Sequence, residues 1–285
     1  MKLKYQMLRL FTKRVLERNT QFKNRHAGET CYIVGNGPSL KNMELSVFSD
    51  HISIGLNLLC LHNDYRLLNI PYHVLAEPFF FYPYVKNPFI DRYQPNVLGR
   101  LFLQAMSRHP DIALFTSLSN IFGPRSNNTY YLYHFGHRQP DKSFFQMNTQ
   151  FSCMAGSFYA GVGLAINMGF KKAILVGCDY LLSPSSIGHF YGVSSIISPG
   201  QDNIYADLLR ECMGLIELQV ITDGGISLLL PYQDYESFTG EKMRRRSNVD
   251  IVAPEYLKLL NRAVELKQYP MAIYPTSESA GAGST

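Results

Sequence analysis

Polar residues stand at the ends of four buried, strand-like runs of this 285-residue chain. Asn36 and Ser39 follow CYIV, Asn57 closes HISIGLN, Glu77 closes YHVLAE, and Asp179 follows KKAILVGC. Ligands of open α/β sheets bind beyond the carboxyl ends of the strands. If these strands are neighbours, their amides, hydroxyl and carboxylates converge. The sequence therefore predicts a site for a polar, phosphorylated ligand.

The turn after the first of these strands is rich in glycine, with the sequence GNGPSL. Gly35 and Gly37 carry no side chain, so a phosphate can approach the backbone, whose N–H groups can receive an anion. Pro38 suits the first turn of a helix. The turn lacks the third glycine of a dinucleotide-binding fingerprint and the GK[ST] of a P-loop. A turn or helix cap without a ligand remains the alternative.

A second group of candidates lies in GCDYLLSPSSIGHFYG. Asp179 follows Gly177 at a strand end, and His189 lies in a glycine- and serine-rich loop. A histidine there can be a general base or a phosphate ligand, or it can merely cap a backbone group. Tyr180 and Tyr191 could stabilise a phosphate leaving group. No DxD element is present, so the sequence predicts no metal site.

Eight histidines could supply a base with a pKa near neutrality. His189 is the first candidate because glycines on both sides would let its loop close over a bound donor. His137, in the long region between the third and fourth strands, is the second candidate.

Alternating strands and helices must position these residues. We predict strands over 31–34, 51–57, 72–77, 171–180 and 219–225, and helices over 156–170, 205–218 and 248–266. Buried strands without polar alternation are typical of parallel sheets that helices cover on both faces. The expected fold is therefore α/β, a Rossmann-like, mostly parallel sheet with helices on both faces. We interpret residues 78–150, rich in Pro, Asn, Tyr and His, as an irregular, partly helical lid or insertion, with a packed loop region as the alternative.

Charge separates the N-terminus from the rest of the chain. The net charge is +5, and residues 1–25 hold eight Lys or Arg against one acid. The near-neutral remainder argues against a nucleic-acid-binding protein. We predict a basic amphipathic helix over 1–26, a nucleotide-binding catalytic domain over 27–275 and a disordered tail over 276–285.

The apolar stripe of the N-terminal helix indicates a surface contact. It consists of Leu3, Met7, Leu10, Phe11 and Val15. We expect residues 1–20 to bind an anionic membrane surface and to be dispensable for folding. Packing on the body, or on a partner subunit of a homo-oligomer, is the alternative.

The compartment is predicted from what the chain lacks. No apolar run reaches the roughly 18–20 residues of a membrane span. The start is too charged for a secretory signal. Five scattered cysteines show neither CxxC nor Cys/His spacing, which favours reduced thiols. We therefore expect a cytoplasmic protein, peripheral at the inner face of the bacterial cytoplasmic membrane.

The GNGPSL turn after a strand, with GFKKAILVGCDY downstream, resembles the bacterial sialyltransferases of glycosyltransferase family 42. It also resembles the related DUF115 group, which includes the flagellin-modifying Maf proteins and archaeal 6-hydroxymethylpterin diphosphokinases. The match covers residues 31–60 and 150–240. It implies a Rossmann-like sheet and a donor that is a CMP-linked sugar acid, with no other cofactor.

The resemblance also implies roles for particular residues. Asn36 would approach the donor phosphate, Asn57 the nucleotide and Ser157 the sugar acid. The family's catalytic histidine lies well downstream of the GxD loop, whereas residues 193–285 contain none here. Tyr180 and Tyr191 match its two leaving-group tyrosines only approximately.

Three functions remain open at this point. The first is a metal-independent glycosyltransferase that moves a sialic-acid-like sugar from a CMP-activated donor to a glycan or glycolipid acceptor of lipopolysaccharide, capsule or glycoprotein. The second is a pterin diphosphokinase that uses ATP and Mg²⁺. The third is a non-catalytic nucleotide-binding protein of envelope assembly. The basic N-terminus favours the first, because a lipid-linked acceptor requires an approach to the membrane.

Overall fold

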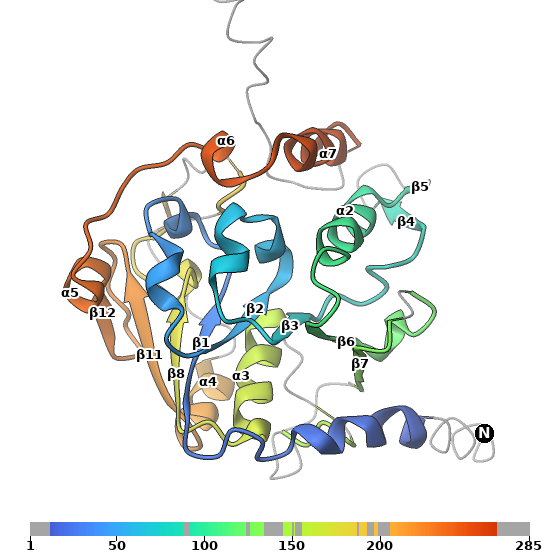
Figure 1. The fold of residues 1–285 in the computed structure, drawn as a ribbon, viewed down its shortest axis with the longest axis horizontal. Coiled ribbons are helices and arrows are strands. Elements are labelled where there is room, and N and C mark those ends of the chain that lie inside the picture. Colours follow the sequence, from blue (N-terminus) through green and yellow to red (C-terminus); the bar gives the residue numbers. More distant parts are fainter. Residues whose placement is uncertain are drawn as a thin grey trace, which may run out of the picture.

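The protein is built around one eight-stranded sheet, shown in a computed structural model (Figure 1). The structure describes residues 12–87, 92–123, 126–133, 145–149, 151, 156–186, 188–192, 197–198 and 206–266. The strand order is β12-β11-β8-β1-β2-β3-β6-β7, and every neighbouring pair is parallel. The α/β, Rossmann-like fold class is thereby confirmed.

The central strands are short and mostly buried. They are β1 (Thr30–Val34), β2 (Ile52–Leu56), β3 (Tyr72–Leu75), β6 (Ala113–Ser117), β7 (Thr129–Leu132), β8 (Lys172–Val176), β11 (Glu217–Thr222) and β12 (Tyr232–Asp234). In β1, β2 and β8, each residue after the first is buried. Such continuous burial requires cover on both faces of the sheet.

Helices provide this cover. They are α2 (Val97–Met106), α3 (Ser157–Met168), α4 (Ala206–Met213), α5 (Tyr235–Thr239), α6 (Asn248–Ile251) and α7 (Pro254–Glu265). The described chain also forms short 3-10 helices: η1 (Arg18–Phe22), η2 (Pro38–Lys41), η3 (Leu45–Phe48), η4 (Asn57–Leu61), η5 (Asn63–Leu67), η6 (Leu118–Asn120) and η7 (Asp179–Leu181). Two small antiparallel pairs join β4 (Tyr84–Asn87) to β5 (Arg92–Pro95) and β9 (Ser185–Ser186) to β10 (Ile197–Ser198).

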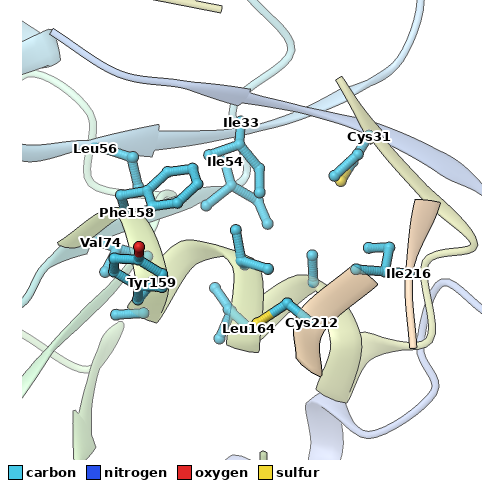
Figure 2. Close-up of a cluster of buried hydrophobic side chains, with 14 of the residues drawn as sticks. Cys31, Ile33, Ile54, Leu56, Val74, Phe158, Tyr159, Leu164, Cys212 and Ile216 are labelled. Carbon is cyan, nitrogen blue, oxygen red and sulfur yellow. The ribbon is translucent and has the colours of Figure 1, made fainter. Parts of the chain in front are cut away.

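The two faces of the sheet carry separate hydrophobic clusters. One joins α3 and α4 to strand residues such as Ile33 and Ile54, as Figure 2 shows. The other lies under α2, α5, α7 and the 3-10 helices. Gly161 lets α3 approach the sheet, since a Cβ there would lie 2.9 Å from the Leu56 side chain.

Two strands of the sheet lie inside the region 78–150, which the sequence analysis interprets as irregular. Strands β6 and β7 extend the sheet beyond β3, and α2 also lies in this region. The sequence pattern missed both strands because each is a single short run among turn-forming residues. Their strand character depends on pairing with β3, which a local pattern does not reveal.

The described part of the N-terminal segment packs on the body. Residues 12–17 are helical and continue into η1, beside edge strand β7 (Figure 1). The Asn19 amide donates to the carbonyls of Tyr131 and Met147, both at 2.8 Å, and Leu16 and Phe22 are buried. This segment protects an exposed sheet edge. This packing argues against dispensability of residues 12–20 for folding, and the expectation for residues 1–11 stays a prediction.

Other parts of the N-terminal and C-terminal predictions differ in detail. Residues 1–11 and the tail 276–285 lie outside the described residues. The helix expected over 205–218 ends at Met213, because β11 begins at Glu217. The helix expected over 248–266 is divided before Pro254, which opens α7. Within the described part of the chain, no helix is both long and apolar enough to span a bilayer.

Candidate functional site

The four polar strand ends lie along one edge of the sheet. Their strands are consecutive neighbours in the order β8-β1-β2-β3. All four strands are parallel, so their carboxyl ends share the same edge. Asp179, Asn36 with Ser39, Asn57 and Glu77 thus follow adjacent strands, which is the arrangement expected of a ligand site in this fold class.

The glycine turn packs directly against the turn after β8. The Gly35 N–H donates to the Val176 carbonyl at 2.8 Å, and the Gly37 N–H donates to the Gly177 carbonyl at 2.9 Å. A Cβ on Gly35 would lie 2.4 Å from the Gly177 oxygen. A Cβ on Gly37 would lie 2.4 Å from Asp179 Oδ2. Both glycines are therefore needed for the close approach of two protein turns.

This packing changes the expected role of the turn's backbone. The N–H groups of Gly35, Gly37 and Ser39 all donate within the protein, the last to Asp179 Oδ2 at 2.8 Å. Pro38 has no N–H. Among the described residues, the Asn36 N–H of this turn has no recorded acceptor. The turn is therefore not the open anion-binding loop that the sequence predicts, and a ligand would meet Asn36.

Asp179 is a buried carboxyl group at the centre of this contact, with 4% of its surface exposed. Burial raises its pKa to about 7, hydrogen bonding to Ser39 opposes that rise, and the Asp223 carboxylate adds to it. Asp223 follows β11 and accepts a hydrogen bond from the Asn42 amide at 3.1 Å. Asp179 can thus exchange a proton near neutral pH while it anchors the turn.

The His189 loop also contacts the glycine turn. The Phe190 N–H donates to the Asn36 carbonyl at 3.0 Å. Burial lowers the pKa of His189 to about 4, against the opposing effect of the Gly188 and Asn36 carbonyls. The imidazole is therefore neutral at pH 7, the form that can accept a proton.

The tyrosines expected to assist differ in exposure. Tyr191 is 1% exposed and lies in the core, its ring centroid 5.1 Å from that of His189. Tyr180 is 49% exposed, and its ring contacts Phe158 edge-on at 5.5 Å. The exposed part of Tyr180 is its ring; burial of its hydroxyl, with the neighbouring Cys178 and Tyr159 adding to the effect, raises the pKa of Tyr180 well above its ordinary value.

Ser157 and Glu77 lie at the β3 end of the edge. Ser157 opens α3 and is 4% exposed, and its hydroxyl oxygen accepts a hydrogen bond from the Ala76 N–H at 2.9 Å. This contact ties the start of α3 to the residue before Glu77. The Glu77 carbonyl accepts from the Asn120 amide at 2.9 Å, and Glu77 itself is exposed at the edge.

An arginine that the sequence analysis did not single out fixes the segment after the glycine turn. The Arg246 guanidinium donates to the carbonyls of Leu40 and Met43 and pairs with Asp64 at 2.7 Å. The run MRRRS was the available signal, but only the fold shows which of its arginines is partly buried against this segment. His137 lies outside the described residues. Within those residues, no three His, Cys, Asp or Glu gather as a metal site would require.

The chain is similar to known proteins only at the level of solved structures. No protein-family model matches the chain, and no curated protein matches its sequence. The structure of a Maf glycosyltransferase from Magnetospirillum magneticum AMB-1 is similar over 83% of this chain, with 12% identity and a TM-score of 0.47. This chain spans 38% of the length of that protein.

The second similarity is to the sialyltransferase CstII from Campylobacter jejuni in complex with cytidine-5'-monophosphate. It covers 84% of this chain and 99% of that one, with 14% identity and a TM-score of 0.43. A CstII Y81F structure with CMP covers 83% and 98%, with 14% identity and a TM-score of 0.38.

Proposed function

We propose that the protein is a metal-independent glycosyltransferase that moves a sialic-acid-like sugar from a CMP-activated donor to a cell-envelope glycan. The observation that carries the proposal is the row of polar residues at the carboxyl ends of β8, β1, β2 and β3. Asn36 and Asn57 follow two of these strands that are direct neighbours. An amide on each neighbouring turn suits a ligand that presents both a phosphate and a nucleoside.

The proposed reaction is a displacement at the anomeric carbon of the donor. The acceptor hydroxyl oxygen forms the new bond to that carbon, the carbon–phosphate oxygen bond breaks, and CMP leaves with the electron pair. Neutral His189 takes the proton of the acceptor hydroxyl. Tyr180, whose hydroxyl keeps its proton because burial raises its pKa, donates to the leaving phosphate.

The N-terminus supports a place at the membrane surface. Basic and apolar residues alternate over residues 1–18, and such segments bind anionic leaflets. Deletion of residues 1–11 leaves the packed segment from residue 12 intact. We expect that variant to fold normally but to lose flotation with anionic liposomes, and equal flotation of both forms would exclude this role.

A thermal-shift panel of CMP, CDP, UDP, GDP and ATP, each with and without Mg²⁺, tests the nucleotide. Ligand at 100 times its Kd stabilises the folded state by about 2.7 kcal/mol, so even weak site binding is measurable at millimolar concentration. We expect stabilisation by CMP that does not require Mg²⁺. Stabilisation by ATP with Mg²⁺ alone would instead support the diphosphokinase.

Asn57→Gly is the matched variant for this panel. Glycine keeps the backbone conformation of residue 57 accessible and removes only the amide. We expect it to reduce the CMP-induced shift while leaving the melting temperature of the free protein close to that of the wild type. A CMP shift equal to the wild type's would place the ligand elsewhere.

A further inference from the structure

Asn57 adopts a backbone conformation that is uncommon for residues other than glycine. Its φ is +51°, in the left-handed region, immediately after β2 and at the start of η4. For a residue with a Cβ this conformation costs about 1–2 kcal/mol relative to right-handed backbone, although asparagine tolerates it better than most residues. Something in the surrounding structure must therefore hold it.

The contact that holds it comes from β3. His73 is completely buried, and its Nε2 lies 2.7 Å from the Asn57 carbonyl oxygen. In the β2–β3 register, His73 lies opposite Gly55, where a Cβ would come within 2.8 Å of Nδ1. The glycine of the strand thus makes room for the imidazole ring.

The partners of the two ring nitrogens define the tautomer of His73. His73 Nδ1 lies 2.9 Å from the Tyr65 hydroxyl. A carbonyl oxygen accepts only, so Nε2 carries the hydrogen that Asn57 receives. Nδ1 therefore accepts from the Tyr65 hydroxyl. Burial lowers the pKa of His73 to about 4, opposed by the bond to Asn57, with the nearby His109 lowering it further. The neutral tautomer persists through physiological pH.

We propose that His73, oriented by Tyr65, is a positioning residue that fixes the left-handed backbone of Asn57 and so directs the Asn57 amide toward the nucleotide. The inference rests on the proposed function for the role of Asn57, but the contact itself does not. His73 touches no ligand; it acts through the turn after β2. His73 lies in the predicted strand 72–77, and the sequence analysis gave it no role.

The chain offers a matched control for a buried histidine paired with a tyrosine. His26 Nε2 lies 2.7 Å from the Tyr72 hydroxyl, and the His26 ring stacks on Phe170 at 4.8 Å. Tyr72 is the first residue of β3, at the amino edge of the sheet. His26→Phe therefore removes a comparable buried pair at the opposite edge from Asn57.

Hydrogen exchange of the ligand-free protein tests the contact. His73→Phe removes the donor, and we expect the amides of residues 57–61 to exchange about fivefold faster, as loss of one net hydrogen bond implies. His73→Gln keeps an N–H donor and should restore part of the protection. His26→Phe should leave these amides unchanged. Equal exchange in wild type and His73→Phe, or the same increase in His26→Phe, would overturn the inference.

If His73→Phe does not fold, Tyr65→Phe provides the milder variant, because it removes only the hydroxyl that orients the ring. The same amides should then exchange faster than in wild type. Unchanged protection in that variant would exclude orientation of His73 by Tyr65.

A double-mutant cycle on the CMP Kd tests the directing role. Asn57→Gly and His73→Phe should each weaken binding about tenfold. Their combination should bind no more weakly than Asn57→Gly, because His73 acts only through the amide that is already gone. Additive losses, about a hundredfold in total, would mean a general structural effect. Failure of the wild type to bind CMP would count against the proposed function, while the exchange data would still decide the contact.

Discussion

The turns after β1 and β2 both place an asparagine at the carboxyl edge, but they are fixed in different ways. Around Asn36, the chain uses glycines, and three N–H groups of the turn donate to β8 and to the residues that follow it. Around Asn57, a residue with a side chain adopts the left-handed region, and one buried histidine donates a hydrogen bond to its carbonyl oxygen. The first turn depends on close approach, and the second depends on a single hydrogen bond.

The two turns should respond differently to substitutions. A Cβ added to Gly37 would lie only 2.4–2.6 Å from its nearest neighbouring atoms, so the first turn has no space for an added side chain. A turn held by one hydrogen bond can relax when that bond is lost. We therefore expect substitutions around Asn36 to act on folding and those around Asn57 to act on local order.

The largest expected effect concerns the loop that packs on the first turn. His189→Ala should lower turnover by roughly 10²–10⁴-fold if His189 is the base, with CMP binding nearly unchanged. With a pKa of about 4, the imidazole stays deprotonated as the pH falls from 7.5 to 5.5, so protonation of His189 itself should not lower turnover there. Steady-state kinetics against pH measures both.

His51→Ala is the control for that experiment, since His51 is partly exposed just before β2, at the amino edge. It should keep wild-type turnover. A His189→Ala variant that does the same would remove His189 from proton transfer, and the kinetic test would pass to His137.

The packing of the first turn is tested by Gly37→Ala. The new Cβ would meet Asp179 Oδ2 and the Gly177 oxygen, and we expect a loss of about 3 kcal/mol in the free energy of unfolding. Urea denaturation measures it. Gly214→Ala is the control, because its Cβ would lie 3.3 Å from the nearest atom. A similar loss in both variants would contradict the packing argument.

The buried carboxyl beneath the first turn predicts a pH dependence. The pKa of Asp179 is raised to about 7, so between pH 4 and 7 the folded state binds more protons than the unfolded state. This group's contribution to stability is therefore lost as the pH rises. Asp179→Asn has no ionisable group here and avoids that loss. The free energy of unfolding of the variant minus that of the wild type should therefore rise by on the order of 2 kcal/mol from pH 5 to pH 7.5. A constant difference at both pH values would contradict the raised pKa.

The smallest effect concerns the second turn. Asn57→Ala must hold a Cβ in the left-handed region, whereas Asn57→Gly need not. We expect the alanine variant to unfold more easily than the glycine variant by about 1 kcal/mol, measured by urea denaturation. Equal stability would show that the turn changes conformation when the side chain is removed.

The sequence predicted strands β1, β2, β3, β8 and β11 and the polar ends that follow four of them, but it missed β6, β7 and β12. CYIV and AILV are apolar throughout, which by itself indicates strands covered on both faces. The region 78–150 was harder, because β6 and β7 become strands only through pairing with β3 and with each other. Local propensity does not contain that information.

Within the site, the sequence alone determined the residue types and where they stand along the chain: amides, a hydroxyl and a carboxyl, each directly after a buried run. Only the tertiary structure decided their partners. It placed β8 beside β1, so that the N–H groups of the glycine turn are used within the protein. It also placed His73 opposite Gly55, within reach of Asn57. Strand order and register join residues distant in sequence, and they arise from the packing of the whole sheet rather than from any segment's own pattern.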